Sequence, residues 1–202
     1  MRETANKLIS ALAAAFPTPF LVRLMRETNR IRLSAEEIFY IAGVIKKKAP
    51  CRLLVFGTGN DSCFWMRLNR GGKTVFIEDD PAWLNRIRKQ NPSCSAYLVE
   101  YGTRRTQWPD LIEAPERLQM ELPEDVRGLH YDCILVDGPH GCEDANPGRM
   151  RSIFEASRLT GAHGDVFVHD CDREVERAYC DRYLGHGILK REIIQLRHYS
   201  FG

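Results

Sequence analysis

Short apolar runs alternate with longer amphipathic stretches along most of the chain. The runs cover residues 52–56, 74–77, 96–99, 131–137 and 165–170. Runs of this length, bounded by glycine, proline or acidic residues, are typical of buried strands. Because helical patterns separate them, the sequence predicts an α/β fold with a doubly wound, mostly parallel sheet of the Rossmann-like type.

The stretches between the runs show the helical spacing of apolar side chains. They predict a helix that begins at Ser34, a short helix near 110–120, and helices over 3–16, 20–28, 61–68, 81–90, 149–158 and 173–183. Ser34 and Glu37 match the capping-box pattern of a helix start. Residues 188–196 alternate only in part and predict one late antiparallel strand.

Two details of the predicted helices bear on packing. We expect Leu8, Ile9 and Leu12 to form the apolar face of the first helix, and Trp83 to face inward from the helix over 81–90. Trp65 is also expected in the core, with stacking of either tryptophan on adenine or on a sugar as the alternative.

The helices before the first strand form a separate segment. We therefore divide one compact domain into residues 1–48, an N-terminal helical segment that packs on the core, and residues 49–202, the ligand-binding domain. The segment either packs against the core or covers a pocket as a lid.

Composition fits a globular protein of one domain. The 202 residues are 44% hydrophobic and 28% charged, and the net charge is +2. A charge this small implies no strong attraction to nucleic acid or to a membrane surface, so we expect neither partner. No apolar stretch approaches the roughly 20 residues that span a bilayer.

Seven cysteines are present without a C-x-x-C pair. An odd number of cysteines, two of them in or beside strand runs, favours a reducing compartment, although one disulfide is compatible with the count.

A glycine turn follows the first strand, and an acidic tip follows the second. The turn is Gly57-Thr58-Gly59, and the tip is Glu78-Asp79-Asp80. Glycines let a ligand approach the backbone, and a carboxylate beyond the second strand can accept hydrogen bonds from ribose hydroxyls. Together they indicate a site for an adenosine-containing ligand. The alternative is an ordinary βαβ unit with a glycine turn.

The residues after the turn favour S-adenosylmethionine over a dinucleotide. The third glycine of the dinucleotide fingerprint is absent, and Asp61 stands where a helix start should meet a pyrophosphate. S-adenosylmethionine has no phosphate, and it carries a cationic sulfonium and a cationic ammonium group. We expect the cofactor to be held by residues of the turn, the acidic tip and two later strand ends: Phe56, Gly57, Thr58, Gly59, Asp61, Ser62, Glu78, Asp79, Tyr101 and Asp137.

Polar side chains also follow the last two parallel strands. Asp137 and His140 follow the fourth predicted strand, and His169 and Asp170 end the fifth. Since the carboxyl ends of parallel strands share one edge, these side chains should share a rim with the glycine turn. Methyl transfer to a hydroxyl needs a positioned nucleophile and a proton acceptor, so these four residues are the candidate catalytic residues. The alternative is that Asp137 caps a helix or places the cofactor and that His169 only packs against its neighbours.

Several motifs resemble one known family. They are V-F-G-T-G-N-D-S (55–62), G-G-K-T-V-F-I-E-D-D-P-A-W (71–83), V-D-G-P with Gly141, P-G-R-M (147–150) and D-V-F-V-H-D (165–170). In this order, over roughly residues 34–184, they resemble the plant glucuronoxylan 4-O-methyltransferase family and its polysaccharide-biosynthesis domain. The resemblance implies a class I methyltransferase in which Gly57 and Gly59 form the cofactor turn and Glu78 holds the ribose.

The resemblance also bears on substrate and location. The plant enzymes carry an amino-terminal membrane anchor and act in the Golgi on the glucuronic acid branches of xylan. This chain has no such anchor, so we expect a cytoplasmic relative that acts on a sugar, a uronic acid or another small acceptor. Arg149 lies in the shared P-G-R-M segment, and a guanidinium that grips a carboxylate with two hydrogen bonds would suit a uronic acid. Its alternative partners are Glu143 and Asp144.

The positions of Asp137 and Asp170 are similar to those of the carboxylates in metal-dependent catechol-type O-methyltransferases. This similarity makes the two residues candidate ligands of a divalent metal ion.

Other functions stay open at this point. The chain could use S-adenosylmethionine for N-methylation or for transfer of its aminobutyrate group. It could also be a non-catalytic methyltransferase-like domain that binds a ligand or a partner.

Overall fold

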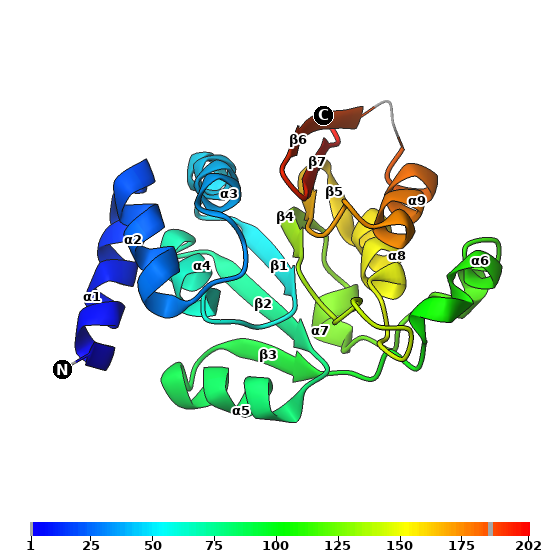
Figure 1. Cartoon of the computed structure of the whole chain (residues 1–202), viewed down its shortest axis with the longest axis horizontal. Coiled ribbons are helices and arrows are strands. Elements are labelled where there is room, and N and C mark those ends of the chain that lie inside the picture. Colours follow the sequence, from blue (N-terminus) through cyan, green and yellow to red (C-terminus); the bar gives the residue numbers. More distant parts are fainter. Residues whose placement is uncertain (1, 186–187) are drawn as a thin grey trace.

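A single sheet runs through the computed structural model, which describes residues 2–185 and 188–202 (Figure 1). In the described residues the sheet has seven strands in the order β3-β2-β1-β4-β5-β7-β6. The strands are β1 (Arg52–Phe56), β2 (Lys73–Glu78), β3 (Ser95–Leu98), β4 (Tyr131–Val136), β5 (Thr160–Val168), β6 (Leu189–Ile193) and β7 (Leu196–Ser200).

The pairing is mostly parallel, as predicted. β1 pairs in parallel with β2 and β4, β2 with β3, and β4 with β5, whereas β7 is antiparallel to both β5 and β6. The late antiparallel pairing is confirmed, but the prediction of one strand over 188–196 is wrong. The chain reverses at Ile194, which has a φ of 54° and is 67% exposed, and this turn divides the region into the hairpin β6–β7.

The helices lie on both faces of the sheet (Figure 1). They are α1 (Arg2–Ala15), α2 (Pro19–Asn29), α3 (Ala35–Lys48), α4 (Ser62–Leu68), α5 (Pro81–Gln90), η1 (Arg105–Gln107), α6 (Trp108–Leu111), η2 (Pro115–Arg117), α7 (Glu124–Arg127), α8 (Met150–Leu159) and α9 (Glu174–Tyr183). The short helix predicted near 110–120 is instead a succession of brief turns. Pro115 lacks an N–H and begins a new turn rather than extending α6.

The two faces of the sheet bury two hydrophobic clusters. Along β1, Leu53 and Val55 pack with the helices from α1 to α5, whereas Leu54 and Phe56 pack with the side that carries α8 and α9. Alternate residues of a strand point to opposite faces, and both faces are covered here. This arrangement explains why the strand runs are continuously apolar.

The N-terminal helices belong to the first of these layers. α1 packs against α2 and α4, with Ala13 and Ala14 buried, whereas Leu8 and Leu12 are 61% and 44% exposed. The predicted apolar face of α1 is therefore wrong for Leu8 and Leu12, whereas Ile9 is partly buried and packs against the core as expected. Among the described residues, no helix is both long and apolar enough to cross a bilayer.

The capping box at the start of α3 is confirmed. The Glu37 N–H donates to Ser34 Oγ at 3.1 Å, and the Ser34 N–H donates to Glu37 Oε2 at 2.8 Å. The N-terminus of α3 lies beside the carboxyl ends of the central strands.

Candidate active site

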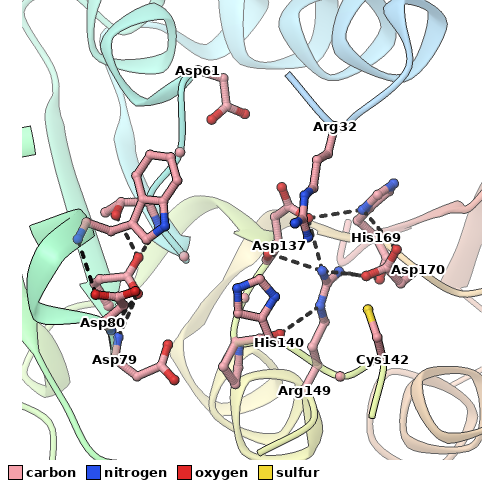
Figure 2. A pocket seen from close by; sticks show the side chains of 18 of the residues that line it. Arg32, Asp61, Asp79, Asp80, Asp137, His140, Cys142, Arg149, His169 and Asp170 are labelled. Carbon is pink, nitrogen blue, oxygen red and sulfur yellow. Dashed lines mark hydrogen bonds and ion pairs between the residues drawn. The ribbon is translucent and has the colours of Figure 1, made fainter. Parts of the chain in front are cut away.

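A cavity of about 390 Å³ opens at the carboxyl ends of β1, β2, β4 and β5 (Figure 2). Strand order reverses between β1 and β4, which is where open α/β sheets bind their ligands. Residues 30–32 of the loop between α2 and α3 complete the wall, so the N-terminal segment contributes to the cavity. Its volume lies within the range of small-molecule sites.

Two glycines bring the ends of β1 and β4 together. Gly57 has a φ of 98°, and a Cβ at this position would lie 3.0 Å from the backbone nitrogen of Gly138. A Cβ on Gly138 would lie 2.7 Å from the Gly57 Cα. A side chain on either residue would therefore push the two loops apart and disturb the cavity floor.

Glu78 joins the glycine turn to the acidic tip. Its Oε2 accepts hydrogen bonds from the Thr58 N–H and Oγ1, both at 2.6 Å. Its Oε1 accepts from the N–H groups of Asp79 and Asp80 at 2.9 and 2.8 Å. Glu78, which the sequence predicted to bind the ribose, thus lines the cavity and also stabilises the glycine turn.

Two further carboxyl groups make the same part of the cavity suited to a cation. Asp61 is 8% exposed and accepts a hydrogen bond from Trp65 Nε1 at 2.9 Å. Burial, followed by the negative charge of Asp137, raises the pKa of Asp61 to about 6. Burial and the neighbouring Glu78 likewise raise the pKa of Asp79 to about 6. A positively charged ligand would relieve this repulsion.

Asp137 and His169 form the centre of the opposite wall. Asp137 Oδ1 lies 3.0 Å from His169 Nδ1 and accepts a hydrogen bond from Arg149 Nη2 at 3.1 Å. Burial opposes ionisation of Asp137, but the hydrogen bond with His169 and the charge of Arg149 outweigh it and lower the Asp137 pKa. Burial disfavours the charged imidazole, yet Asp137 raises the pKa of His169 overall.

The second oxygen of Asp137 is left for a ligand. Asp137 Oδ2 has no hydrogen bond or ion pair within the described part of the chain, and the side chain is 25% exposed at the cavity. A carboxylate with one oxygen anchored and one oxygen open is suited to accept a proton from a bound hydroxyl.

Arg149 uses its donors within the protein. Nη1 donates to the carbonyl oxygens of His169 at 2.7 Å and Val136 at 3.4 Å, and Nε donates to that of Pro139 at 3.4 Å. Nη2 donates to the Asp137 carbonyl oxygen at 3.1 Å, in addition to Oδ1. The side chain is 5% exposed.

Arg149 therefore joins the ends of β4 and β5 rather than offering a free fork to a substrate carboxylate. Asp144, one of the two alternative partners predicted for Arg149, forms an ion pair with Arg105 instead.

The same guanidinium bears on the metal hypothesis. Arg149 Nη2 lies 2.6 Å from Asp170 Oδ2 as well as 3.1 Å from Asp137 Oδ1, so a cation of the protein itself already bridges the two predicted ligands. Throughout residues 2–185 and 188–202, no group of three or more His, Cys, Asp or Glu side chains is placed to hold a metal ion. The residues do not fit a divalent metal centre.

Three of the predicted cofactor residues do not line the cavity. Phe56 is fully buried in the core. Ser62 accepts the Gly59 N–H through Oγ at 2.9 Å, and Tyr101 accepts a hydrogen bond from Ser152 Oγ at 3.0 Å. Phe56, Ser62 and Tyr101 therefore lie behind the cavity wall, where they support the turn and the neighbouring helix.

The remaining predicted residues lie in the wall. Gly57, Thr58, Gly59, Asp61, Glu78 and Asp79 form one side, and Asp137, His140, Arg149, His169 and Asp170 form the other. The sequence interpretation thus brought together residues that the fold indeed places on one rim.

The sequence analysis missed two residues that line the cavity and predicted the wrong position for a third. Arg32 extends into the cavity from the N-terminal segment (Figure 2), and Arg173 lines it from the start of α9. Neither residue follows a strand, so no sequence pattern marked them. Trp83, expected to face inward, is half-buried and lines the cavity, with Arg86 Cζ 4.9 Å from its ring centroid.

Comparisons with known proteins show the family of this chain. Residues 36–120 and 115–199 match the family described as IRX15/IRX15L/GXM. The chain is 36% identical to Glucuronoxylan 4-O-methyltransferase 1 of Arabidopsis thaliana, covering 96% of this chain and 74% of that protein. It is 33% identical to Arabinogalactan O-methyltransferase 2 of the same plant, covering 98% and 78% respectively. These matches confirm the resemblance inferred from the motifs.

A solved structure supports the fold. A putative caffeoyl-CoA O-methyltransferase from Staphylococcus aureus aligns over 97% of this chain and 98% of its own, with a TM-score of 0.57 at 13% identity. At this identity the match concerns the fold alone, and it confirms the Rossmann-like methyltransferase architecture.

Proposed function

Because the chain belongs to the IRX15/IRX15L/GXM family, we propose that it is an S-adenosylmethionine-dependent O-methyltransferase acting on a hydroxyl of a sugar or uronic acid. Relatives named for methyl transfer to glucuronoxylan and arabinogalactan support a saccharide acceptor. The observation that carries the proposal is the free oxygen of Asp137 in a cavity whose other wall is a glycine turn with an acidic tip.

The residues present fit S-adenosylmethionine. Thr58 and Gly59 of the turn line the cavity beside the acidic tip, where Asp79 offers carboxylate oxygens to ribose hydroxyls, because both oxygens of Glu78 already accept two hydrogen bonds each from the protein. Asp61, whose pKa is raised by burial, would gain a counter-ion in the cationic methionine end of the cofactor. Trp83 offers a half-buried ring on which adenine can stack.

The proposed chemistry needs one proton acceptor. The cofactor supplies a methyl group activated by a positively charged sulfur. Asp137 Oδ2 accepts the proton of the acceptor hydroxyl while the carbon–oxygen bond forms and the carbon–sulfur bond breaks. The products are a methyl ether, S-adenosylhomocysteine and a protonated Asp137. His169, anchored to Oδ1 at 3.0 Å, keeps the carboxylate oriented.

Arg32 and Arg173 line the acceptor side of the cavity together with Asp137 and Asp170, and the cofactor side is lined mainly by carboxyl groups. Arg173 is paired with Asp170 at 3.0 Å, so Arg32 is the cation that we assign to the carboxylate of a uronic acid. Because the donors of Arg149 are engaged within the protein, a substrate carboxylate would meet Arg32 rather than Arg149. His140 is exposed and lines the cavity, and we assign it a contact with the sugar.

The first test is calorimetric titration with S-adenosylmethionine and S-adenosylhomocysteine, followed by incubation with acceptors. We expect binding of both nucleosides and addition of one methyl group to oligosaccharides that carry glucuronic acid, measured by mass spectrometry. Matched xylo-oligosaccharides without the uronic acid are the control acceptor.

Each other outcome has a distinct meaning. Release of methylthioadenosine would show use of the aminobutyrate group. Absence of binding by either nucleoside would contradict the proposal and favour a non-catalytic domain.

A further inference from the structure

The cofactor side of the cavity is acidic, but the proposed cofactor also carries a negative charge. Asp61, Glu78 and Asp79 line this side. The methionine end of S-adenosylmethionine has a carboxylate beside its ammonium and sulfonium groups. Carboxyl groups of the protein suit the two cations of the ligand, but they repel its carboxylate. A site for the whole cofactor therefore needs a protein cation in this part of the wall.

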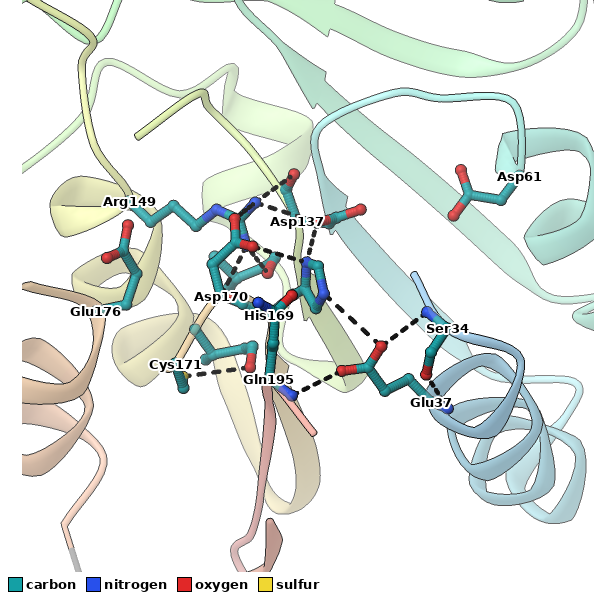
Figure 3. Close-up of polar contacts among 12 residues, drawn as sticks. Ser34, Glu37, Asp61, Asp137, Arg149, His169, Asp170, Cys171, Glu176 and Gln195 are labelled. Atoms are coloured by element: carbon teal, nitrogen blue, oxygen red, sulfur yellow. Dashed lines mark hydrogen bonds and ion pairs between the residues drawn. The ribbon is translucent and has the colours of Figure 1, made fainter. Parts of the chain in front are cut away.

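Four arginines of the described residues line the cavity, and two of them are already paired. The four are Arg30, Arg32, Arg149 and Arg173. Arg149 lies between Asp137 and Asp170, at 3.1 Å from the first and 2.6 Å from the second (Figure 3). Arg173 Nη2 lies 3.0 Å from Asp170 Oδ2 and donates to Cys142 Sγ at 3.2 Å. Arg30 and Arg32 are therefore the arginines of the wall that a ligand can engage.

Arg30 and Arg32 differ in what lies beside them. Both residues are exposed, and neither side chain has a hydrogen bond or ion pair with another residue in the described ranges 2–185 and 188–202. Arg32 points toward Asp137, where we place the acceptor hydroxyl (Figure 2). Arg30 instead lies beside the glycine turn, since Asn60 Nδ2 approaches its carbonyl oxygen to 3.5 Å and Asn60 directly precedes Asp61. Arg30 thus has no protein partner and no assigned ligand.

The backbone around Arg30 is anchored on both sides. Arg30 follows α2 with a φ of 56°, and its N–H donates to the Arg26 carbonyl oxygen. The Ile31 N–H donates to the same oxygen at 3.1 Å, and the Ile31 side chain is 7% exposed. Arg26 Nε donates to the carbonyl oxygen of the fully buried Leu33 at 2.8 Å. Because Ile31 and Leu33 face the core, the loop keeps Arg30 and Arg32 at the cavity wall.

We propose that Arg30 binds the carboxylate at the methionine end of S-adenosylmethionine, while Asp61 binds the ammonium group. The proposal rests on the proposed function, because it adds a subsite for the same cofactor. The two ligand groups share one carbon atom, and the two protein groups lie on adjoining segments, since Asn60 contacts Arg30 and precedes Asp61. A guanidinium can donate two parallel hydrogen bonds to a carboxylate. The N-terminal segment thereby completes the cofactor site.

The test compares two ligands that differ only in this carboxylate, S-adenosylmethionine and decarboxylated S-adenosylmethionine. Their dissociation constants are measured by calorimetry at neutral pH and low ionic strength, because salt screens an exposed ion pair. We expect the wild type to bind S-adenosylmethionine about tenfold more tightly, as hydrogen bonds between charged groups allow. An acidic wall without a cation would instead favour the decarboxylated ligand, which has one more net positive charge.

Arg30→Gln should abolish this preference. We expect it to weaken binding of S-adenosylmethionine by about tenfold without weakening binding of the decarboxylated ligand, so that the second ligand also shows that the variant is folded. Arg30→Lys keeps the charge and should retain part of the preference. The control is Arg23→Gln, because Arg23 also belongs to α2 but pairs with Glu27 and does not line the cavity. It should leave both dissociation constants unchanged.

Two further variants test the placement of the ligand. Asp61→Asn should weaken both ligands to a similar extent, because both retain the ammonium group. Arg32→Gln should leave the preference between the two ligands in place. Loss of the preference in Arg32→Gln but not in Arg30→Gln would overturn the proposal, as would an equal preference in wild type and Arg30→Gln.

The outcomes for the wild type separate this proposal from the proposed function. Equal affinity for the two ligands would overturn the subsite and leave the cofactor assignment intact. Binding of neither ligand would overturn both. Neither measurement requires turnover, so a protein that shows the expected preference but transfers no methyl group would support the subsite and contradict the proposed activity.

Discussion

Arg149 Nη2 lies 2.6 Å from Asp170 Oδ2, with the two side chains only 5% and 11% exposed. Asp170 has a φ of 63°, in the left-handed region that few residues other than glycine adopt. The ion pair holds this turn at the end of β5 against the start of α8. Burial lowers the pKa of a guanidinium, but the charges of Asp137 and Asp170 raise the Arg149 pKa overall, so it stays charged.

Removing the guanidinium should therefore destabilise the protein strongly. We expect Arg149→Ala to lower the free energy of unfolding by about 3–5 kcal/mol, because it leaves buried carboxylates without a counter-ion. The control is Arg23→Ala, since Arg23 and Glu27 form an ion pair whose side chains are 75% and 54% exposed. That variant should change stability by less than about 1 kcal/mol. Urea unfolding measures both, and equal losses would contradict the structural role of Arg149.

Asp137→Asn should separate binding from turnover. The variant retains the shape of the side chain but lacks the ionised oxygen that accepts the hydroxyl proton. We expect kcat to fall by about 10²-fold to 10⁴-fold, with the Kd for S-adenosylmethionine nearly unchanged. Asp110→Asn, on the exposed face of α6, controls for the loss of one negative charge. Full turnover in Asp137→Asn would show that the proton goes elsewhere.

Two glycine-to-alanine variants should have opposite effects on stability. At Gly57 the positive φ and the 3.0 Å approach to Gly138 make a side chain costly, so we expect Gly57→Ala to destabilise by about 1–3 kcal/mol and to weaken cofactor binding. Gly43 lies in α3 with nothing within 4 Å of an added Cβ, and Gly43→Ala should stabilise by about 0.5–1 kcal/mol. Thermal unfolding followed by circular dichroism distinguishes them, and a Gly57→Ala protein as stable as wild type would contradict the predicted crowding.

Cofactor binding should weaken in acid. Burial raises the pKa of Asp61 to about 6, so below this pH the carboxyl group is protonated and cannot attract a cationic ligand. We expect the affinity for S-adenosylmethionine to be constant well above pH 6 and to fall as pH drops through 6, by up to about tenfold per pH unit for this group. Calorimetry in two buffers of different ionisation enthalpy should also detect proton release on binding near pH 6.

Asp61→Asn should bind weakly and lose part of this pH dependence. Burial also raises the pKa of Asp79 to about 6, so Asp79→Asn should remove the other part. A wild-type affinity that does not change between acid and neutral pH would contradict the role of both carboxyl groups.

Local sequence patterns were enough to predict the elements that frame the site. The run 52–56 is β1 to the residue, and the helix predicted over 81–90 is α5 to the residue, because Gly57, Pro81 and the Asn91-Pro92 pair end or begin the elements without help from distant contacts. The capping pair Ser34 and Glu37 is equally local. Patterns that depend on packing were less reliable, as the exposed Leu8 and Leu12 of α1 show.

The sequence by itself determined the succession of strands and helices along the chain, the glycine turn and the polar strand ends, since each depends on residues close together in the chain. Only the tertiary structure decided which side chains share partners. Arg149 looked like a substrate ligand, but the fold surrounds it with carbonyl oxygens and carboxylates that use its donors. Glu37 looked like a helix cap, but the fold places it against His169, 132 positions later in the chain. Such contacts arise from the packing of distant segments, and no local pattern encodes them.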